Sequence, residues 1–192
     1  LHIRSSFSNA EGTIISKEVK AMEDIVVSGI ALQKNEAKLT ICDVPDRPGI
    51  AAKIFKRIST HNISIDMIIQ NVSRTGFTDI SFTLLKSDLP RALKILTKAS
   101  KDIKAGGVTY DVDIAKVSVV GVGMRSHSGI AAKMFESLAE HKINIEMIST
   151  SEIKISCIIK KRHAEKALNA LHKKFMLEKL GAKPKLISGV RR

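Results

Sequence analysis

One segment of the sequence occurs twice, and this repeat constrains the fold more than any other feature. Residues 49–68 read GIAAKIFKRISTHNISIDMI, and residues 129–148 read GIAAKMFESLAEHKINIEMI. At a constant offset of 80 positions, eleven of the twenty residues are identical. Self-similarity at a fixed offset indicates a repeated structural unit. The chain is therefore expected to contain two copies of one small fold, packed against each other.

Both copies show the same order of expected elements. Runs rich in β-branched residues predict first strands at 38–44 and 116–122, and an i, i+3, i+4 apolar pattern predicts helices that start after Gly49 and Gly129. Further strands are expected at 63–69, 78–85 and 108–112 in the first copy and at 143–148 and 152–159 in the second, with second helices at 90–100 and 163–175. The expected fold class is α+β: two ferredoxin-like βαββαβ units packed together, each an antiparallel sheet with its helices on one face.

The second copy has no clear fourth strand of its own. Residues 177–192, which follow its second helix, are a weak strand candidate, whereas residues 24–32 (DIVVSGIAL) are a strong candidate without a repeat. We therefore expect residues 24–32 to supply the missing edge strand. The expected domains are a first unit at 38–113, a discontinuous second unit at 22–34 plus 114–178, and a basic tail at 179–192.

Charge and composition limit the possible partners. Lys and Arg number 32 against 19 Asp and Glu, and residues 160–192 alone hold eleven basic and two acidic residues. A basic tail can contact nucleic acid. Single-strand binders also need exposed aromatic rings for base stacking, and this chain has one Tyr, no Trp and six Phe. The charge thus favours a solvated helix face, and an RNA-binding ferredoxin-like protein is kept as an alternative.

The sequence also predicts a location. No apolar run reaches the ~18–20 residues of a membrane span, and the first residues lack the pattern of a signal peptide. Cys42 and Cys157 each lie within an apolar run, which suits reduced core thiols rather than a disulfide or a metal site. We expect a cytoplasmic protein without a membrane partner.

Catalytic and metal-binding patterns are absent from the sequence. There is no GxxxxGK[ST] phosphate loop, and neither HExxH nor CxxC occurs. Gly121-Val-Gly123 resembles the start of a dinucleotide fingerprint, but Ser126 stands where the third glycine belongs. We interpret it as a turn. No catalytic residue and no metal site are expected.

The two helix starts offer a geometry for a small ligand. Free backbone N–H groups and the positive end of the helix dipole favour a carboxylate at Gly49 and again at Gly129. A nearby acid could bind an ammonium group; the candidates are Asp46, Asp66, Glu146 and Glu152. Together these groups would bind a free amino acid. The alternative is an ordinary pair of helix starts beside solvated acids.

The repeated unit resembles the ACT domain, which senses amino acids. The resemblance lies in a strand, a turn ending in Pro-Gly or Ser-Gly, a helix that starts with GIAA, and a strand with the pattern Ile-x-Ile-x-Met-Ile. The strings IDMIIQNVSRTGFTDISFTL and GVGMRSHSGIAAKMFESLAEHKINIEMISTSEIKIS resemble the regulatory end of the aspartate kinase family. Residues 1–21 begin with LHIRSSFSNAEGTII, which resembles the end of that family's kinase domain. Met22 opens a segment that resembles the start of its separately made regulatory subunit.

The resemblance implies a function. Aspartate kinases transfer the ATP γ-phosphate to L-aspartate, the first step towards lysine, threonine and methionine, and their ACT units mediate feedback inhibition by threonine, lysine or both. ACT units commonly associate side by side, with the effector held between units. We expect a homodimer or association with a catalytic chain, which would supply the ATP and magnesium sites. These 192 residues alone are expected to be inactive. A plain dimerisation module with vestigial sites is the other alternative.

The resemblance also implies two effector sites, with Ile backbone groups binding the effector's ammonium and carboxylate. The first would use Asp46, Gly49, Ile50, Ala51, Ser64, Ile65, Asp66 and Gln70. The second would use Ser128, Gly129, Ile130, Ala131, Asn144, Ile145, Ser151 and Glu152. Ser64 stands where relatives often have Asn, as Asn144 does in the second copy, and Ser128 replaces a usual Pro.

Overall fold

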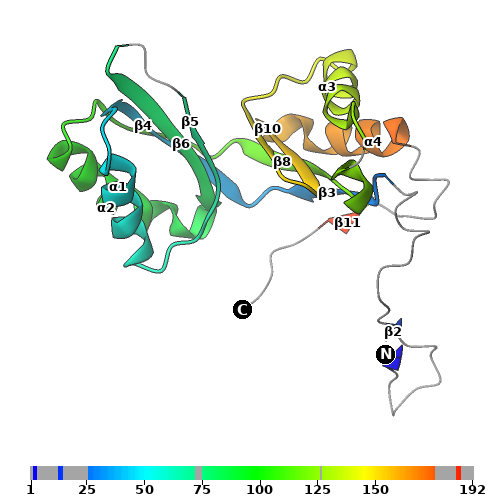
Figure 1. Ribbon diagram of the computed structural model, residues 1–192, viewed down its shortest axis with the longest axis horizontal. Coiled ribbons are helices and arrows are strands. Elements are labelled where there is room, and N and C mark those ends of the chain that lie inside the picture. Colours follow the sequence, from blue (N-terminus) through cyan, green and yellow to red (C-terminus); the bar gives the residue numbers. More distant parts are fainter. Residues whose placement is uncertain are drawn as a thin grey trace.

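The computed structural model describes residues 26–71, 75–125 and 127–175, and three two-residue strands: β1 (His2–Ile3), β2 (Thr13–Ile14) and β11 (Lys185–Leu186). Two α+β units lie next to each other, with their sheets towards the middle and their helices on the outside (Figure 1). Apart from those short strands, the expected kinase-domain segment at 1–21 and the basic tail at 179–192 lie outside the described residues.

The first unit is a four-stranded antiparallel sheet with two helices. Its strands lie in the order β5-β6-β4-β7, as expected for a ferredoxin-like βαββαβ unit. In chain order, the elements are β4 (Glu36–Pro45), α1 (Ile50–Ser59), β5 (Ile65–Gln70), β6 (Phe77–Leu85), α2 (Leu89–Asp102) and β7 (Gly107–Asp111).

Alternation along the strands explains why both helices cover one face of this sheet. Leu39 and Ile41 on β4 pack with Phe82 on β6 and with Ile54 and other apolar residues of the helices, and all of these side chains are buried. Because side chains of successive strand residues point to opposite faces, the residues between them face away from the helices. The sheet thus keeps a second, helix-free face.

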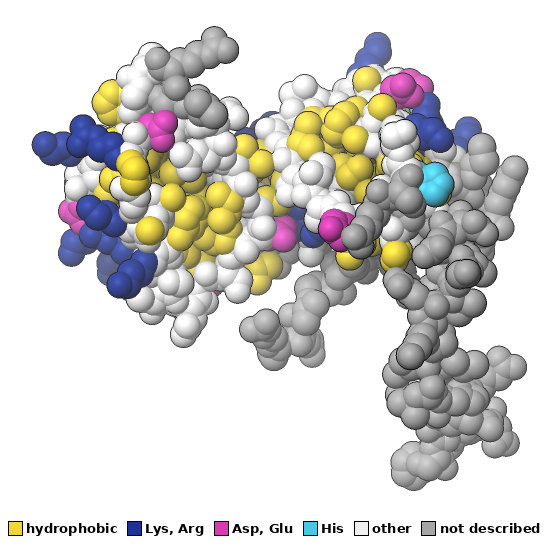
Figure 2. Space-filling model, viewed as in Figure 1, with side chains coloured by type: hydrophobic (Ala, Val, Ile, Leu, Met, Phe, Trp, Pro, Cys, Tyr) yellow, Lys and Arg dark blue, Asp and Glu magenta, His cyan; other side chains and the backbone are white. Residues whose placement is uncertain are grey.

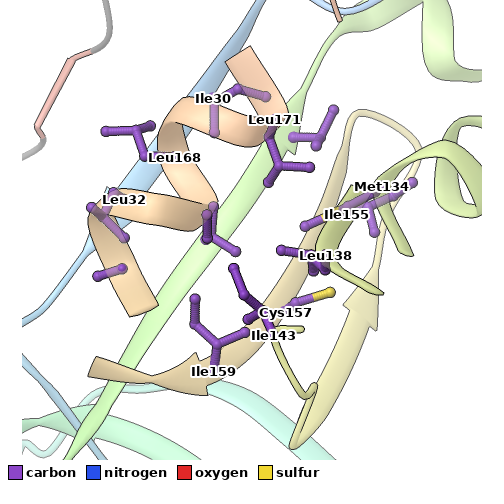
Figure 3. Packing of buried hydrophobic residues seen from close by; sticks show 14 of the residues in the cluster. Ile30, Leu32, Met134, Leu138, Ile143, Ile155, Cys157, Ile159, Leu168 and Leu171 are labelled. Carbon is purple, nitrogen blue, oxygen red and sulfur yellow. The ribbon is translucent and has the colours of Figure 1, made fainter. Parts of the chain in front are cut away.

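The second unit is completed by a strand from the N-terminal region. Its elements are β8 (Ile114–Val120), α3 (Ile130–Glu140), β9 (Met147–Thr150), β10 (Lys154–Lys160) and α4 (Ala164–Lys174), together with β3 (Gly29–Gln33). Strand β3 pairs antiparallel with β8, the pairing expected for residues 24–32. Figure 3 shows Ile30 and Leu32 of β3 directed into the same apolar cluster as Leu168 and Leu171 of α4.

Several details differ from the expected elements, including the bounds of β3 at Gly29–Gln33 and the start of β5 at Ile65 rather than at residue 63. The two-residue strand β11 adds a parallel partner outside β3, where only antiparallel pairing was expected. Val122 belongs to a 3₁₀ turn (Val122–Arg125) rather than to the preceding strand. Strand β9 begins at Met147, not at residue 143, because the Ile143 N–H donates to the Leu138 carbonyl at 2.9 Å and so closes the end of α3.

The two units pack through their helix-free faces. Strand β4 lies against β8 and β5 lies against β9. An apolar cluster fills this seam; its buried members are Met67, Ile114, Met147 and Ile158, and Ile69 packs against them. Lysines and acids from opposite units surround the cluster: Lys116 binds Glu36 and Asp66, and Lys38 binds Glu146. The expected two packed α+β units are thereby confirmed.

The two cysteines have different environments. Cys157 on β10 is fully buried, and burial raises the pKa of its thiol to about 12. Cys42 on β4 is only half-buried, because its neighbour Ile41 occupies the core position. The expectation of two core thiols is therefore wrong for Cys42.

This difference predicts how the thiols react. Because burial raises the pKa of the Cys157 thiol to about 12, this thiol stays protonated at pH 8 and reacts slowly. We expect one thiol per chain to react with an aromatic disulfide reagent in the native protein and two after unfolding in urea. The Cys42→Ser variant should lose the native reaction; rapid modification of Cys157 in that variant would contradict the buried position.

Candidate functional site

The turn between β4 and α1 has a defined backbone. The Asp46 N–H donates to the Gly76 carbonyl at 2.9 Å, which ties the turn to the start of β6, and the Ile50 N–H donates to the Arg47 carbonyl at 3.3 Å. Gly49 precedes α1 with φ 87°, a left-handed conformation that glycine adopts without strain. The turn thus delivers the chain into the helix in a fixed direction.

The second turn repeats this geometry. Gly129 precedes α3 with φ 88°, nearly the value at Gly49. In the part of the chain that the structure describes, no side chain caps the first turn of α1 or α3, and neither first turn contains an acid. The first N–H groups of a helix lack carbonyl partners within the helix. Both helix starts therefore favour an anionic group such as a carboxylate.

A hollow of about 360 Å³ lies at the first turn. Five residues that the sequence predicted for the first effector site line it: Asp46, Gly49, Ile50, Ala51 and Gln70. Its volume is within the ~300–1,000 Å³ range of small-molecule sites. The Asp46 carboxylate, the Gln70 amide and the start of α1 surround this space. A carboxylate can bind the ammonium group of a zwitterion, and a helix start can bind its carboxylate.

Arg47 also lines this hollow and was not predicted as a site residue. Its guanidinium could pair with a carboxylate, since Arg binds carboxylates in a bidentate geometry. The signal was present in the sequence, because Arg47 stands between Asp46 and the Pro48-Gly49 pair. The family resemblance implied a site built mainly from backbone groups, so the Arg47 side chain was not among the predicted residues.

Three residues predicted for the same site lie elsewhere. Gln70 pairs with Ile80 near the turn, whereas Ile65 pairs with Leu84 towards the other end of β5. At ~3.3 Å per residue, the two ends of this strand are about 17 Å apart. Ser64, Ile65 and Asp66 therefore do not line the hollow formed by Asp46 and Gln70 in the same chain.

The residues predicted for the second effector site also lie in separate places. Ser128 and Gly129 are exposed at the helix start, and Ile130 and Ala131 follow in α3. Ser151 and Glu152 lie in the turn after β9, close to the end of β8, because the Gly121 N–H donates to the Ile153 carbonyl at 2.9 Å. The remaining two residues, Asn144 and Ile145, precede β9 at its opposite end.

Two of the four acids considered for an ammonium group bind lysines at the seam. Asp66 forms an ion pair with Lys116. Glu146 binds Lys38 and, at 3.0 Å, Lys160. Partial burial raises the pKa of the Glu146 carboxyl, but the hydrogen bonds from the two lysines outweigh burial and hold this pKa below its ordinary value. Asp46 is thus the acid that the structure places at the hollow.

The described apolar residues at the seam between the units are closely packed. Met67, Ile114 and Ile158 are at most 3% exposed there, and Lys116 is 3% exposed. The sequence predicted an effector held between ACT units, and the hollow that five of the predicted residues line is at the outer turn of the first unit. Separately, no helix among the described residues is long and apolar enough to cross a membrane.

Comparison with protein families and known proteins agrees with this architecture. Models of the ACT domain match residues 38–101 and residues 117–175. Aspartate kinase of Pseudomonas fluorescens (strain SBW25) is 50% identical over 179 residues, which cover 93% of this chain and 43% of that protein. Aspartokinase of Pseudomonas aeruginosa is 49% identical over 180 residues, with coverage of 93% and 44%. The chain spans less than half the length of these relatives.

Two of the solved structures that resemble this chain are covered over nearly their whole length. One, described as aspartokinase alpha and beta subunits, is 48% identical with a TM-score of 0.74, covering 79% of this chain and 99% of the solved chain. The ligand-free regulatory subunit of aspartate kinase from Thermus thermophilus is 42% identical with a TM-score of 0.75, covering 78% and 99%. The chain therefore belongs to the aspartate kinase family, as a tandem pair of ACT domains of the kind that forms its regulatory subunit.

Proposed function

We propose that this chain senses a free amino acid and thereby mediates feedback inhibition of an aspartate kinase, which phosphorylates L-aspartate with ATP. The observation that carries the proposal is the hollow at the first turn, because Asp46, Arg47 and Gln70 line it beside the start of α1. ATP and magnesium would bind to the catalytic domain, and we assign no residue of this chain to them.

The lining suggests how an amino acid would be oriented. Its carboxylate would accept hydrogen bonds from the first N–H groups of α1 and pair with Arg47. Its ammonium group would pair with Asp46, and the Gln70 amide, which can donate and accept hydrogen bonds, would contact the effector side chain. Threonine and lysine are the effectors we propose, on the basis of the family resemblance.

A second copy of the chain would complete this site. Strand β5 is at an edge of its sheet, and its residue Ile68 is 51% exposed. Exposed sheet edges readily pair with another strand. Antiparallel pairing of two β5 strands would bring Ser64 and Ile65 of the second copy beside Gln70 of the first. The predicted residues that lie about 17 Å apart within one chain would then meet across a dimer contact.

Regulation would follow from differential affinity. An effector that binds one arrangement of the units more tightly shifts the population towards that arrangement. Coupling of this kind typically amounts to about 1–3 kcal/mol, or ~5–150-fold in affinity. An attached or associated catalytic domain that prefers the other arrangement would lose activity as effector concentration rises.

Calorimetric titration of the full chain with threonine, lysine and methionine tests the proposal. We expect saturable heat from threonine or lysine. The Asp46→Ala and Asn144→Ala variants should each bind more weakly with the fold intact, Asp46→Ala by about 10- to 100-fold, because a hydrogen bond to a charged group contributes ~1.5–3 kcal/mol. Asp113→Ala removes an exposed acid between the units and serves as the matched control.

Three outcomes would contradict the proposal. Absence of heat with all three amino acids would remove the sensing role. Unchanged affinity in both variants would show that the site lies elsewhere. Sedimentation would then measure the assembly state with and without each amino acid. If the assembly state does not change and no heat is seen, the chain is a plain dimerisation module.

A further inference from the structure

The outer helices of the two units differ strongly in charge. Helices α1 and α2 of the first unit contain seven Lys or Arg residues and one acid, whereas α3 and α4 of the second contain four basic and three acidic residues. We call α1 and α2 the basic helix layer; its cations are Lys53, Lys56, Arg57, Arg91, Lys94, Lys98 and Lys101. Figure 2 shows dark-blue side chains gathered at the outer edge of this unit.

The fold does not require all of these charges, because the second unit has the same fold with fewer of them; it keeps Lys133, Lys166 and Lys173 at the positions of Lys53, Arg91 and Lys98. In the sequence repeat, Lys56 corresponds to Glu136 and Arg57 to Ser137. Alignment of the second helices places Asn169 at the position of Lys94. The apolar positions are kept in both units, for example Ile54 and Met134 in the two cores. The two units therefore share their core positions and differ in the charge of their outer helix faces.

The arrangement of the cations is unfavourable for an isolated helix. In α2, Arg91, Lys94, Lys98 and Lys101 follow one another at intervals of three or four residues, and like charges at such spacing destabilise a helix. Two acids offset part of this repulsion: Asp88 pairs with Arg91 at 2.9 Å, and Asp102 pairs with Arg57 at 2.7 Å. The remaining row of positive charge is best explained by an anionic partner.

Two adjoining hollows follow the basic helix layer and share Arg57. The larger, of about 930 Å³, extends from the first turn along α1 to the end of α2, and the smaller, of about 560 Å³, lies between α1 and α2 beside Lys94 and Lys98. Apolar side chains contribute to both, Ile103 and the 52%-exposed Phe77 to the first and Ile95 to the second. The surface thus combines an apolar floor with a basic rim.

The larger hollow also adjoins the proposed effector site. Asp46, Arg47 and Ile50 line both. The first turn of helix α1 therefore lies at the proposed effector site. The outer face of the same helix, with Lys56 and Arg57, belongs to the basic helix layer. A ligand that moved the start of α1 would move this surface too, because the helix is a rigid element.

We propose that the basic helix layer docks on an acidic, Asp- and Glu-rich surface of the catalytic aspartate kinase domain. The proposal rests on the proposed function and names the surface through which the effector signal would reach that domain. A protein fits better than a nucleic acid, because the cations extend over the ~21 Å of α2 around an apolar floor. Among the residues that line the two hollows, the rings available for base stacking are Phe77 in the larger hollow and His61 in the smaller one, and neither hollow has a Tyr or Trp.

Binding of the full chain to the purified catalytic domain of the same organism's aspartate kinase tests this proposal, measured at 50 and 300 mM salt. The test variant is Lys56→Glu with Lys94→Asn, which introduces the residues that the second unit carries at these positions. The control is Lys133→Glu with Lys173→Asn, the same charge change on exposed sites of α3 and α4. All four substituted lysines are exposed on helix surfaces, so both variants should fold. Urea unfolding of each variant checks this.

We expect about tenfold weaker binding of the wild-type chain at the higher salt concentration, since exposed charge pairs are screened. The test variant should lose at least about tenfold in affinity at 50 mM salt and the control less than about twofold. The single variants Lys56→Glu and Lys94→Asn should each show part of the loss. Effector titration of the test variant should match the wild-type chain, which separates failure of docking from failure of amino-acid sensing.

Several results would overturn the proposal. Absence of binding at 50 mM salt, equal losses in the test and control variants, or affinity that ignores salt would each exclude docking through this surface. Tighter binding of a single-stranded RNA oligonucleotide than of the catalytic domain, abolished by the test variant, would assign the surface to nucleic acid instead.

Discussion

The Lys116→Met variant is expected to lose about 3–5 kcal/mol of unfolding free energy, the range for breaking a buried ion pair by removal of one partner. The side chains of Lys116 and Glu36 are 4% and 6% exposed, and the ammonium group lies 2.5 Å from a Glu36 carboxylate oxygen. Lys116 also binds Asp66 of β5. Methionine fills a similar volume without the charge, so the variant leaves the Glu36 carboxylate buried without its cation.

Urea unfolding of matched variants would separate this effect from a general loss at the seam. Lys160→Met is the control, because Lys160 also binds acids at the seam, Asp111 at 2.5 Å and Glu146 at 3.0 Å, but its side chain is 40% exposed. Solvent screens exposed pairs such as these, so the Lys160→Met variant should lose much less stability than the Lys116→Met variant. Adding Glu36→Gln to Lys116→Met should restore part of the loss. Equal losses for Lys116→Met and Lys160→Met would contradict the importance of burial.

The Gly121→Ala variant is expected to lose about 3 kcal/mol of unfolding free energy, at the upper end of the usual range for overpacking. A Cβ atom at Gly121 would lie 2.2 Å from the Val26 carbonyl oxygen and 2.8 Å from the Val27 Cα. Both contacts are with backbone, which cannot rotate away. The segment that leads into β3 would have to move away from β8, and the second unit would lose its edge strand.

Gly29→Ala provides the comparison for Gly121→Ala. Gly29 begins β3, and a Cβ atom there would meet no other atom within 4 Å. We expect a change in unfolding free energy below about 1 kcal/mol for this variant. Hydrogen exchange of the β3 amides should become faster in Gly121→Ala and stay slow in Gly29→Ala. Wild-type stability of Gly121→Ala would show that the N-terminal strand is not held against β8 as described.

The seam has an internal two-fold relationship that links the two candidate sites. Lys38 and Lys116 occupy equivalent positions in the first strands, and Asp66 and Glu146 are equivalent in the repeat. Each lysine binds the acid of the other unit. Strand β5, which ends at the hollow with Gln70, is therefore held by the second unit. This crossed pairing ties the strand that follows each first helix to the other unit.

Much of the fold was predictable because it depends on local patterns. The twin segments at 49–68 and 129–148, the glycines that open both helices and the alternation in 78–85 each report the environment of neighbouring residues. The pairing of the N-terminal strand with β8 was predictable for another reason: the second copy had no clear fourth strand of its own to fill that place. Element ends were less certain, as Ile143 shows: a local backbone hydrogen bond to Leu138 holds it at the end of α3, although its apolar alternation predicted a strand.

The sequence by itself determined the repeated unit, the order of its elements and the two turns where a zwitterion could bind. Only the tertiary structure decided that Asp66 and Glu146 bind lysines of the opposite unit, that Arg47 joins Asp46 and Gln70 around one hollow, and that Gly121 is needed for the close approach of the N-terminal strand. The physical reason is distance along the chain. Periodicity and turn chemistry act between near neighbours, whereas these contacts join residues from about 25 to 110 positions apart, whose meeting depends on how the two sheets pack.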